Sequence, residues 1–209
     1  MQNAAFAAAG LAWEYAAVEV EPEDLAAAVH SIRERWAGAN VTIPHKQAVV
    51  ALCDEAEGES VNTLVLRDGR VLGFNTDVEI VAGIEARRVC LIGAGGGAKA
   101  LLPGLAGEVQ VFSRSGEWPP DASSSDLIVN ATPVRDKLLV EPRAEQIVVD
   151  LAYYPDGRAT ALVEAARAAG CEVVDGLEAL VRQGARSFEL WTELEAPVAA
   201  MRAALGLPP

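Results

Sequence analysis

A lysine and an aspartate in the first half of the sequence lie where side chains can do acid–base chemistry. Lys46 follows residues 40–45 (Asn-Val-Thr-Ile-Pro-His), where a proline turn after an expected strand can direct a side chain into a cleft. Lysine is a plausible proton donor there, although a lysine at a helix start is more often a solvated surface residue. Asp77, in Asn75-Thr76-Asp77, opens the next expected helix, where an acid serves equally well as a cap.

A glycine-rich turn near the middle of the chain could hold a phosphate group. Residues 89–92, an apolar strand, lead into Gly93-Ala94-Gly95-Gly96-Gly97-Ala98, which matches the GxGxxG/A pattern between a strand and a helix. Gly93 would allow the tight turn, Gly95 would let the backbone approach a pyrophosphate, and Ala98 would allow close helix packing. The alternative is a glycine-rich connection in an α/β core. The strand before and the helix after favour a dinucleotide site.

The end of the following strand bears on the choice of dinucleotide. An NAD site usually has Asp or Glu about 20 residues beyond the first glycine, but here the strand ends in Ser113-Arg114-Ser115. Arg114 could neutralise a 2′-phosphate, which favours NADP over NAD. A solvated surface arginine is nearly as common, and Glu117 would oppose a phosphate if it pointed the same way.

Composition excludes several classes of partner. The chain has 209 residues, 51% of them hydrophobic, and a formal net charge of −13. Such a charge repels nucleic acid and anionic membrane surfaces, so we expect neither as a partner. His30 and His45 offer no metal cluster. The apolar start of the chain lacks the basic residues of a signal peptide, and no apolar run is long enough to span a membrane.

The three cysteines, Cys53, Cys90 and Cys171, are odd in number and widely spaced. Neither a disulfide framework nor a thiolate metal site is therefore indicated, and a reducing cytoplasm fits best. The oligomeric state stays open, with a homodimer among the alternatives.

The positions of apolar residues predict an α/β fold throughout. In the first half we expect helices at 3–15, 23–36 and 46–53, a helix after Asn75, and strands at 16–20, 40–43, 63–67 and 70–74. Asp68-Gly69 is typical of a type I′ hairpin turn between the last two strands.

In the second half the alternation is regular and predicts a doubly wound, largely parallel sheet. We expect strands at 89–92, 109–112, 127–130, 147–151 and 172–174, a helix after the glycine turn that Pro103 and Gly104 weaken, a helix at 159–169, and a surface loop at 116–125. Residues 177–205 should form two helices that Pro197 separates. The expected domains are 1–86, with the C-terminal helix 193–209 packing back on it, and 87–192.

Several separate motifs, in this order, give the chain a resemblance to the shikimate dehydrogenase family. The motifs are residues 40–46, Val61-Asn62-Thr63, Gly73-Phe74-Asn75-Thr76-Asp77, the Gly93 turn, Asn130-Ala131-Thr132-Pro133, residues 150–155, and 175–192 with Gln183-Gly184-Ala185. The match covers nearly the whole chain. The family implies an N-terminal α/β substrate domain, a Rossmann-like NADP domain, and reversible NADPH-dependent reduction of 3-dehydroshikimate to shikimate in aromatic amino-acid biosynthesis.

The resemblance also implies roles for particular residues. Lys46 and Asp77 would be the catalytic pair, with the lysine handling the proton at the substrate oxygen. Residues expected to bind substrate are Thr42, Asn62, Tyr153 and Gln183. Residues expected to bind NADP are Gly93, Ala94, Gly95, Gly96, Gly97, Ala98, Ser113, Arg114, Ser115, Thr132 and Gly176. Phe188 and Trp191 would return with the last helices towards the substrate domain.

The chain also departs from the family pattern in two places. Members usually begin with a further strand and a turn bearing two serines that hold the substrate carboxylate, whereas Met1-Gln2-Asn3 corresponds to a point after that turn; we therefore expect an incomplete carboxylate site. Between Arg114 and Asn130 members usually have a further helix and strand, so one wall of the adenosine site should be missing, with Trp118 near the usual second basic residue. The alternatives are a quinate/shikimate dehydrogenase that uses NAD and a non-catalytic dinucleotide-binding paralogue.

Overall fold

The computed structural model describes residues 1–208 and divides the chain into two compact units. Unit 1 comprises Met1–Asp77 and Gln183–Pro209, and unit 2 comprises Val78–Arg182. These divisions fall somewhat earlier in the chain than the predicted domain limits after residues 86 and 192.

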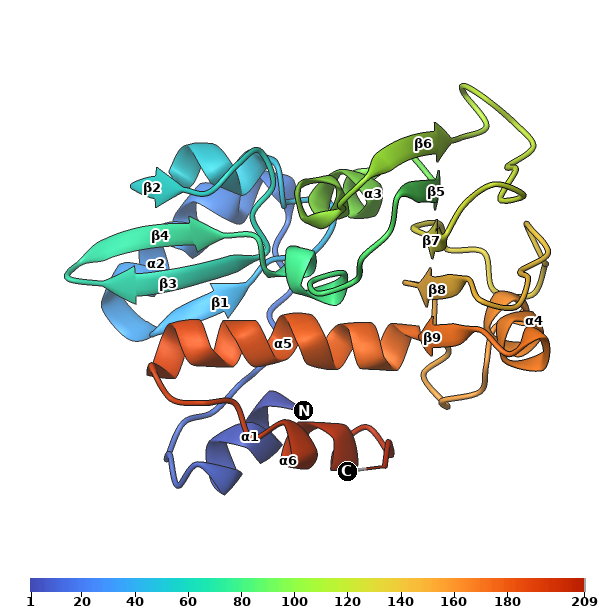
Figure 1. Cartoon of the computed structure of the whole chain (residues 1–209). Coiled ribbons are helices and arrows are strands. Elements are labelled where there is room, and N and C mark those ends of the chain that lie inside the picture. The colour runs from blue at the N-terminus through green and yellow to red at the C-terminus, as the bar shows by residue number, and fades with distance from the viewer. Residues whose placement is uncertain (209) are drawn as a thin grey trace. The chain divides into compact units, whose positions relative to one another are not determined.

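A mixed four-stranded sheet with the order β1-β3-β4-β2 forms the centre of unit 1 (Figure 1). Its strands are β1 (Gly38–Asn40), β2 (Glu55–Ala56), β3 (Thr63–Arg67) and β4 (Arg70–Phe74). β3 pairs antiparallel with both β1 and β4, and β2 is parallel to β4. The predicted hairpin is confirmed, because Asp68 and Gly69 have φ values of 52° and 75°, as a type I′ turn requires.

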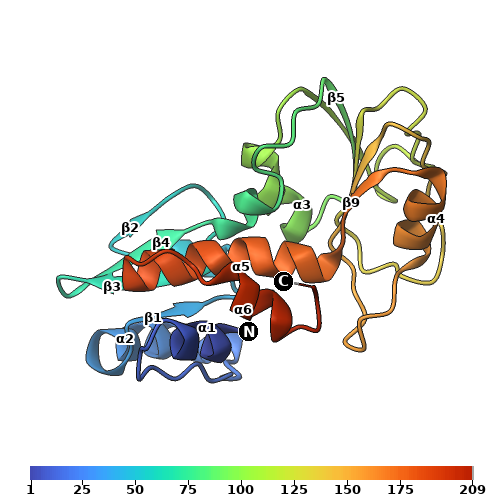
Figure 2. The same ribbon diagram turned by 60° about the horizontal axis from the view of Figure 1, so that its bottom comes forward.

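The other elements of unit 1 are helices that pack around this sheet or against one another. They are α1 (Gln2–Ala8), α2 (Leu25–Arg35) after the 3₁₀ helix Pro22–Asp24, the 3₁₀ helix Ala48–Leu52, the end of α5 (Gly176–Thr192), and α6 (Val198–Ala203). An apolar core joins α2 to the sheet through Leu25, Val29, Ile32, Leu64 and Val71. α1 and α6, from opposite ends of the chain, pack side by side (Figure 2). Phe188 is fully buried 5.7 Å from the ring of Phe6, so it is a core aromatic.

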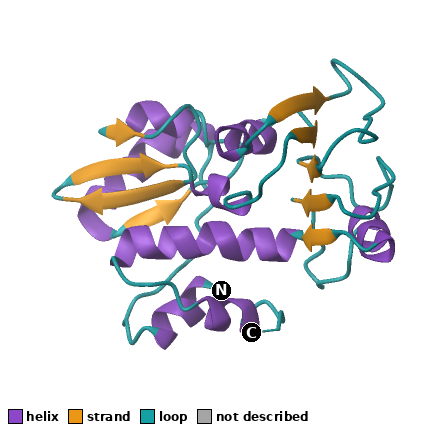
Figure 3. Cartoon of the chain, viewed as in Figure 1, coloured by secondary structure: helices purple, strands orange, loops and turns teal. Residues whose placement is uncertain are grey.

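The N-terminal quarter of the chain differs most from the prediction. The first helix ends at Ala8 rather than at residue 15, and residues 16–20 form no strand but a loop (Figure 3). Within the described residues, the backbone groups of residues 16–19 make no hydrogen bond to other backbone, because no strand lies beside them. A cavity of about 570 Å³ lies between this loop, α2 and β1 instead. β1 is thus one of the two edge strands of the sheet, and β2 is the other.

Shorter differences occur where the chain turns sharply. The strand predicted at 40–43 is β1 at Gly38–Asn40, and the helices predicted at 46–53 and after Asn75 are 3₁₀ helices at Ala48–Leu52 and Thr76–Ile80. Short strand β2 was not predicted, because its two exposed residues carry no apolar alternation.

Unit 2 is a parallel five-stranded sheet with the order β6-β5-β7-β8-β9. Its strands are β5 (Arg88–Ile92), β6 (Glu108–Phe112), β7 (Leu127–Asn130), β8 (Ile147–Asp150) and β9 (Glu172–Val174), and all of their pairings are parallel. The predicted strands and the doubly wound class are confirmed. This order places a topological switch point between β5 and β7, where such folds bind ligands.

Alternating side chains of these strands supply two apolar cores, one on each face of the sheet. Val89 and Leu91 pack on the face that carries α3 (Gly96–Leu101) and the start of α5. Cys90 and Ile92 pack on the opposite face with α4 (Ala161–Ala169). The 3₁₀ helix Leu102–Gly104 ends α3 at the predicted weak point, and no helix connects β6 to β7 in the described chain.

Candidate active site and dinucleotide pocket

Lys46 and Asp77 form a short ion pair in unit 1. Lys46 Nζ lies 2.6 Å from Asp77 Oδ2, and the two side chains are only 18% and 12% exposed. Lys46 follows the turn after β1, in which His45 N donates to Thr42 O at 2.9 Å. Asp77 follows β4 at the start of a 3₁₀ helix, and its N–H donates to Asn75 Oδ1 at 3.3 Å. Two turns thus position the pair that the family resemblance implied.

Asn62 fixes the other oxygen of the carboxylate. Its Nδ2 donates to Asp77 Oδ1 at 2.8 Å, and its Oδ1 accepts from Thr76 N at 2.7 Å. The amide is 3% exposed and its two ends have opposite partners, so it cannot turn over without losing both bonds. Asn62 therefore holds Asp77 in the orientation that faces Lys46.

A buried hydroxyl cluster supports Asn62 from behind. Ser187 Oγ lies 2.9 Å from Thr63 Oγ1 and 3.2 Å from Thr76 Oγ1, and Asn40 Nδ2 donates to it at 3.0 Å. Ser187 is fully buried on α5. The sequence analysis missed this residue, because Ser187 is 124 positions from Thr63 and no local pattern marks it.

The arrangement leaves Lys46 with capacity to donate. An ammonium group has three N–H donors, and the side chain makes no hydrogen bond other than the one to Asp77 within the described residues. The pair can therefore present a positioned proton to an oxygen atom of a ligand.

The other three expected substrate residues are placed differently. Thr42 is exposed, and its hydroxyl makes one weak bond, to Ile43 O at 3.4 Å. Gln183 lies on α5 in unit 1, and its backbone carbonyl oxygen accepts a hydrogen bond from Ser187 Oγ at 3.1 Å. Tyr153 belongs to unit 2 and is 40% exposed. Their roles towards a substrate stay predictions.

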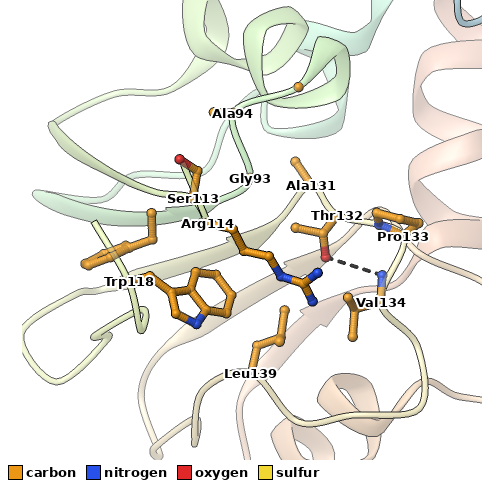
Figure 4. Close-up of a pocket in the computed structure, with 12 residues that line it drawn as sticks. Gly93, Ala94, Ser113, Arg114, Trp118, Ala131, Thr132, Pro133, Val134 and Leu139 are labelled. Atoms are coloured by element: carbon orange, nitrogen blue, oxygen red, sulfur yellow. Dashed lines mark hydrogen bonds between the residues drawn. The ribbon is translucent and has the colours of Figure 1, made fainter. Parts of the chain in front are cut away.

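Unit 2 has a pocket at the carboxyl ends of β5, β6 and β7 (Figure 4). Its volume is about 320 Å³, and it lies at the switch point of the sheet. Six of the residues expected to bind the cofactor line it, namely Gly93, Ala94, Gly95, Ser113, Arg114 and Thr132. Trp118, Pro133, Val134 and Leu139 add apolar walls. Trp118 and Leu139 thus form one wall of this pocket.

Gly93 is required by the geometry of this pocket. Its φ is 114°, and a Cβ there would lie 3.1 Å from Ala131 O. Gly95 begins α3 as its N-cap, and a Cβ there would have nothing within 4 Å. Space for a ligand is therefore left above Gly95.

Arg114 has no hydrogen-bond or ion-pair partner within the described residues, although Glu117 is close in sequence. Glu117 instead accepts two bonds of 3.1 Å from Gln110 Nε2 on β6. Figure 4 shows the Arg114 side chain extending across the pocket towards Thr132 and Val134. A guanidinium without a protein partner beside a glycine turn fits a phosphate group.

The remaining expected cofactor residues do not line the pocket. Ala98 is buried in the core at 1% exposure, which agrees with its expected packing role. Gly176 approaches the chain closely, since a Cβ there would lie 2.8 Å from Ala152 O. Gly96 and Gly97 lie in the first turn of α3, and Ser115 Oγ lies 3.3 Å from Ser113 Oγ.

A buried carboxylate is linked through Asn130 to Thr132, which lines the pocket. Asp150 Oδ1 accepts from Asn130 Nδ2 at 2.8 Å, and Asn130 Oδ1 accepts from Thr132 Oγ1 at 2.7 Å. Burial raises the pKa of Asp150, against the opposing effect of its bond from Thr160. The motif at residues 130–133 therefore holds Thr132 in place.

Two further findings concern metal ligands and apolar helices. The described residues contain no group of three or more His, Cys, Asp or Glu side chains that could hold a metal ion. No helix among them is both long and apolar enough to cross a membrane. The fold and the two sites define a two-unit α/β protein with a Rossmann-type parallel sheet, a glycine turn and a separate lysine–aspartate pair.

Comparison with known proteins identifies the family. Residues 1–64 match the model of the shikimate dehydrogenase substrate binding domain, and residues 176–205 match that of the shikimate 5′-dehydrogenase C-terminal domain. The shikimate dehydrogenase (NADP⁺) of Pyrobaculum aerophilum is 32% identical over 98% of this chain and 91% of its own length. The chain belongs to the shikimate dehydrogenase family.

Solved structures agree with this assignment. A crystal structure of a shikimate dehydrogenase in complex with NADP⁺ matches with a TM-score of 0.87 and 27% identity, over 98% of this chain and 88% of the other. The enzyme of Thermus thermophilus, in complex with NADP(H) and shikimate, matches with a TM-score of 0.83 and 28% identity, over 98% of this chain and 92% of the other. The prediction of an N-terminal α/β domain with a Rossmann-like domain is therefore confirmed.

Proposed function

We propose that this protein is an NADP-dependent shikimate dehydrogenase, an oxidoreductase that reversibly reduces 3-dehydroshikimate to shikimate in aromatic amino-acid biosynthesis. The observation that carries the proposal is the ion pair of 2.6 Å between Lys46 and Asp77, buttressed by Asn62. Relatives that share the whole length of the chain are named for the same activity.

The chemistry needs a proton donor next to the ketone oxygen. NADPH, when bound, supplies hydride to the ketone carbon. Lys46 donates a proton to the oxygen as it gains the electron pair of the carbonyl bond, and is reprotonated from solvent. Asp77 directs the ammonium group of Lys46, and Asn62 keeps Asp77 in place. In the reverse direction Lys46 accepts the hydroxyl proton of shikimate.

The pocket of unit 2 suits NADP. Gly93 and Gly95 let the backbone approach the pyrophosphate, and N–H groups in the first turn of α3 donate to it. Arg114, which has no partner among the described residues, binds the 2′-phosphate. Ser113, Ser115, Thr132 and Gly176 border the cofactor in this proposal.

Unit 1 binds the substrate in this scheme, and unit 2 binds the cofactor. Thr42, Asn62 and Gln183 of unit 1 donate or accept hydrogen bonds at the substrate hydroxyls, whereas Tyr153, the fourth expected substrate residue, belongs to unit 2. The enzyme works in the cytoplasm, which suits the free thiols of Cys53, Cys90 and Cys171. We propose that the protein forms a homodimer, which light scattering would test by measuring the molar mass in solution.

The test is the absorbance of NADPH formed from NADP and shikimate by purified protein, with NAD and quinate in parallel. We expect turnover with NADP and shikimate, and its loss in Lys46→Ala. Lys137→Ala, which changes an exposed lysine of unit 2, is the matched control and should turn over normally. NADP binding without turnover in the wild type would instead support a non-catalytic dinucleotide-binding paralogue, and preference for NAD and quinate would identify the other alternative.

A further inference from the structure

An indole ring forms one wall of the pocket in unit 2. Trp118 lines it together with Arg114, Val134 and Leu139, and Figure 4 shows the ring beside the Arg114 side chain and above Leu139. The residue is 40% exposed, although it is the largest apolar side chain of the pocket. No ring contact or cation–π contact to Trp118 occurs among the described residues, and its exposed surface lines the pocket.

A tight turn ties this indole to the end of β6. Gly116 N donates to Ser113 O at 3.0 Å, and Ser113 N donates to Glu117 O at 3.0 Å. The Gln110 amide holds the Glu117 side chain on β6 as well. The same turn therefore positions both Arg114 and Trp118 at the pocket.

The chemistry of the wall selects a flat aromatic ligand that carries an anion. An aromatic base stacks on an indole through its face, whatever its hydrogen-bonding edge. Arg114 next to the ring binds a phosphate attached to the same nucleoside. Val134 and Leu139 supply further apolar surface.

We propose that Trp118 is a base-stacking residue, against which the adenine of the dinucleotide lies while Arg114 takes the phosphate on the adjoining ribose. This inference rests on the proposed function, because it presupposes that the pocket binds NADP. It assigns recognition of the base to one residue and recognition of the 2′-phosphate to another.

The division of roles has a measurable signature. Stacking does not depend on the 2′-phosphate, so loss of the indole should weaken NADP, NAD and 2′,5′-ADP by similar factors. Loss of the guanidinium should weaken NADP and 2′,5′-ADP and leave NAD nearly unchanged. A merely structural role of Trp118 would lower thermal stability without this pattern.

The experiment is calorimetric titration of the full-length protein with NADP, NAD and 2′,5′-ADP, for wild type, Trp118→Ala, Trp118→Phe and Arg114→Gln. We expect Trp118→Ala to raise each Kd about tenfold or more, and Trp118→Phe to restore most of the affinity. Trp36→Ala removes an indole of similar exposure, 42%, from unit 1 and should bind all three nucleotides normally. Thermal melting of each variant checks the fold.

The outcomes separate the two proposals. If the wild type binds NADP, and Trp118→Ala binds 2′,5′-ADP with the same Kd as the wild type, the inference that the base stacks on Trp118 is wrong. The proposed function then still stands. If Trp118→Ala weakens NADP but not NAD, the residue acts at the phosphate and the inference is also wrong. If the wild type binds none of the three nucleotides, the proposed function fails and the inference fails with it.

Discussion

The two sites of this protein differ in whether their charged group is paired with another protein group. Lys46 in unit 1 is mostly buried and paired with Asp77, which is itself held by Asn62. Arg114 in unit 2 lines an open pocket and has no protein partner in the described part of the chain. A group that must direct a proton needs a fixed position before the substrate arrives. A group that binds a phosphate can receive its partner with the ligand.

This contrast predicts different consequences of substitution. Changes around Lys46 should alter turnover, or turnover and stability together, because Asp77, Asn62 and Ser187 near it each have more than one partner. Changes around Arg114 should alter nucleotide affinity and little else. The substitutions at Asp77, at the two glycines and at Ser187 each test one side of the contrast.

The largest effect is expected for Asp77→Asn. The substitution keeps the shape of the side chain but removes the charge that holds Lys46, so we expect kcat to fall about 100- to 1,000-fold with the NADP Kd unchanged. Stopped assays with long incubation measure kcat, and calorimetry measures the NADP Kd. Asp68→Asn, at the hairpin turn of the same unit, is the matched control, because Asn also adopts its positive φ. A weaker NADP complex would break the contrast.

A pair of glycine substitutions sharpens the description of the pocket. Gly93→Ala forces a side chain onto a φ of 114° and should cost about 1–3 kcal/mol of folding free energy as well as NADP affinity. Gly95→Ala has a φ of −80° and no protein atom within 4 Å of its new Cβ, so it should weaken NADP while leaving stability unchanged. Urea unfolding and calorimetry distinguish the two. Equal stability losses would show that the space above Gly95 is not reserved for a ligand.

Ser187→Ala tests the support behind the active site. It removes a buried hydroxyl shared by Thr63, Thr76 and Asn40, and should cost about 1–3 kcal/mol in urea unfolding. Because Ser187 contacts neither Lys46 nor Asp77, we expect kcat to fall by less than about tenfold, far below the 100-fold of a lost proton-transfer group. Ser31→Ala, on α2, removes a part-buried hydroxyl with a single local bond and is the control. A kcat loss as large as that of Asp77→Asn would make Ser187 part of the proton path.

The smallest effect concerns pH and lies outside both sites. The bond from Val71 N, followed by that from Arg33, lowers the pKa of Asp54. A carboxylate whose pKa is lowered in the folded state stabilises the fold above its unfolded pKa of about 4, and this contribution is lost as pH falls through the folded value. Asp54→Asn should therefore lower the melting temperature at pH 7, with the difference from wild type shrinking below about pH 4. A constant difference across that range would contradict the assignment.

Unit 2 was predicted from the sequence almost strand by strand. Residues 172–174 are the observed β9. Residues 127–130 are the observed β7, because a continuous apolar run between turns is typical of a strand buried on both faces. The glycine turn was located for the same local reason. The loop after β6 was expected too, but the turn that brings Trp118 to the pocket was not.

Unit 1 was predicted less well, because its structure depends on distant partners. Residues 16–20 alternate like a strand, yet a strand forms only beside another strand. Lys46, Asp77 and Asn62 were proposed from motifs, whereas Ser187 acts through contacts with side chains 111 to 147 positions away. A pattern within one element cannot reveal such contacts.

The edge strand β1 has a consequence for the behaviour of the protein in concentrated solution. An unpaired strand edge is a template for another chain, and the net charge of −13 repels other copies of this protein. Salt shortens the range of this repulsion to about 3 Å at 1 M. Colloidal stability should therefore be best at low ionic strength and decline as salt is added, so the charge of the whole surface protects one short strand.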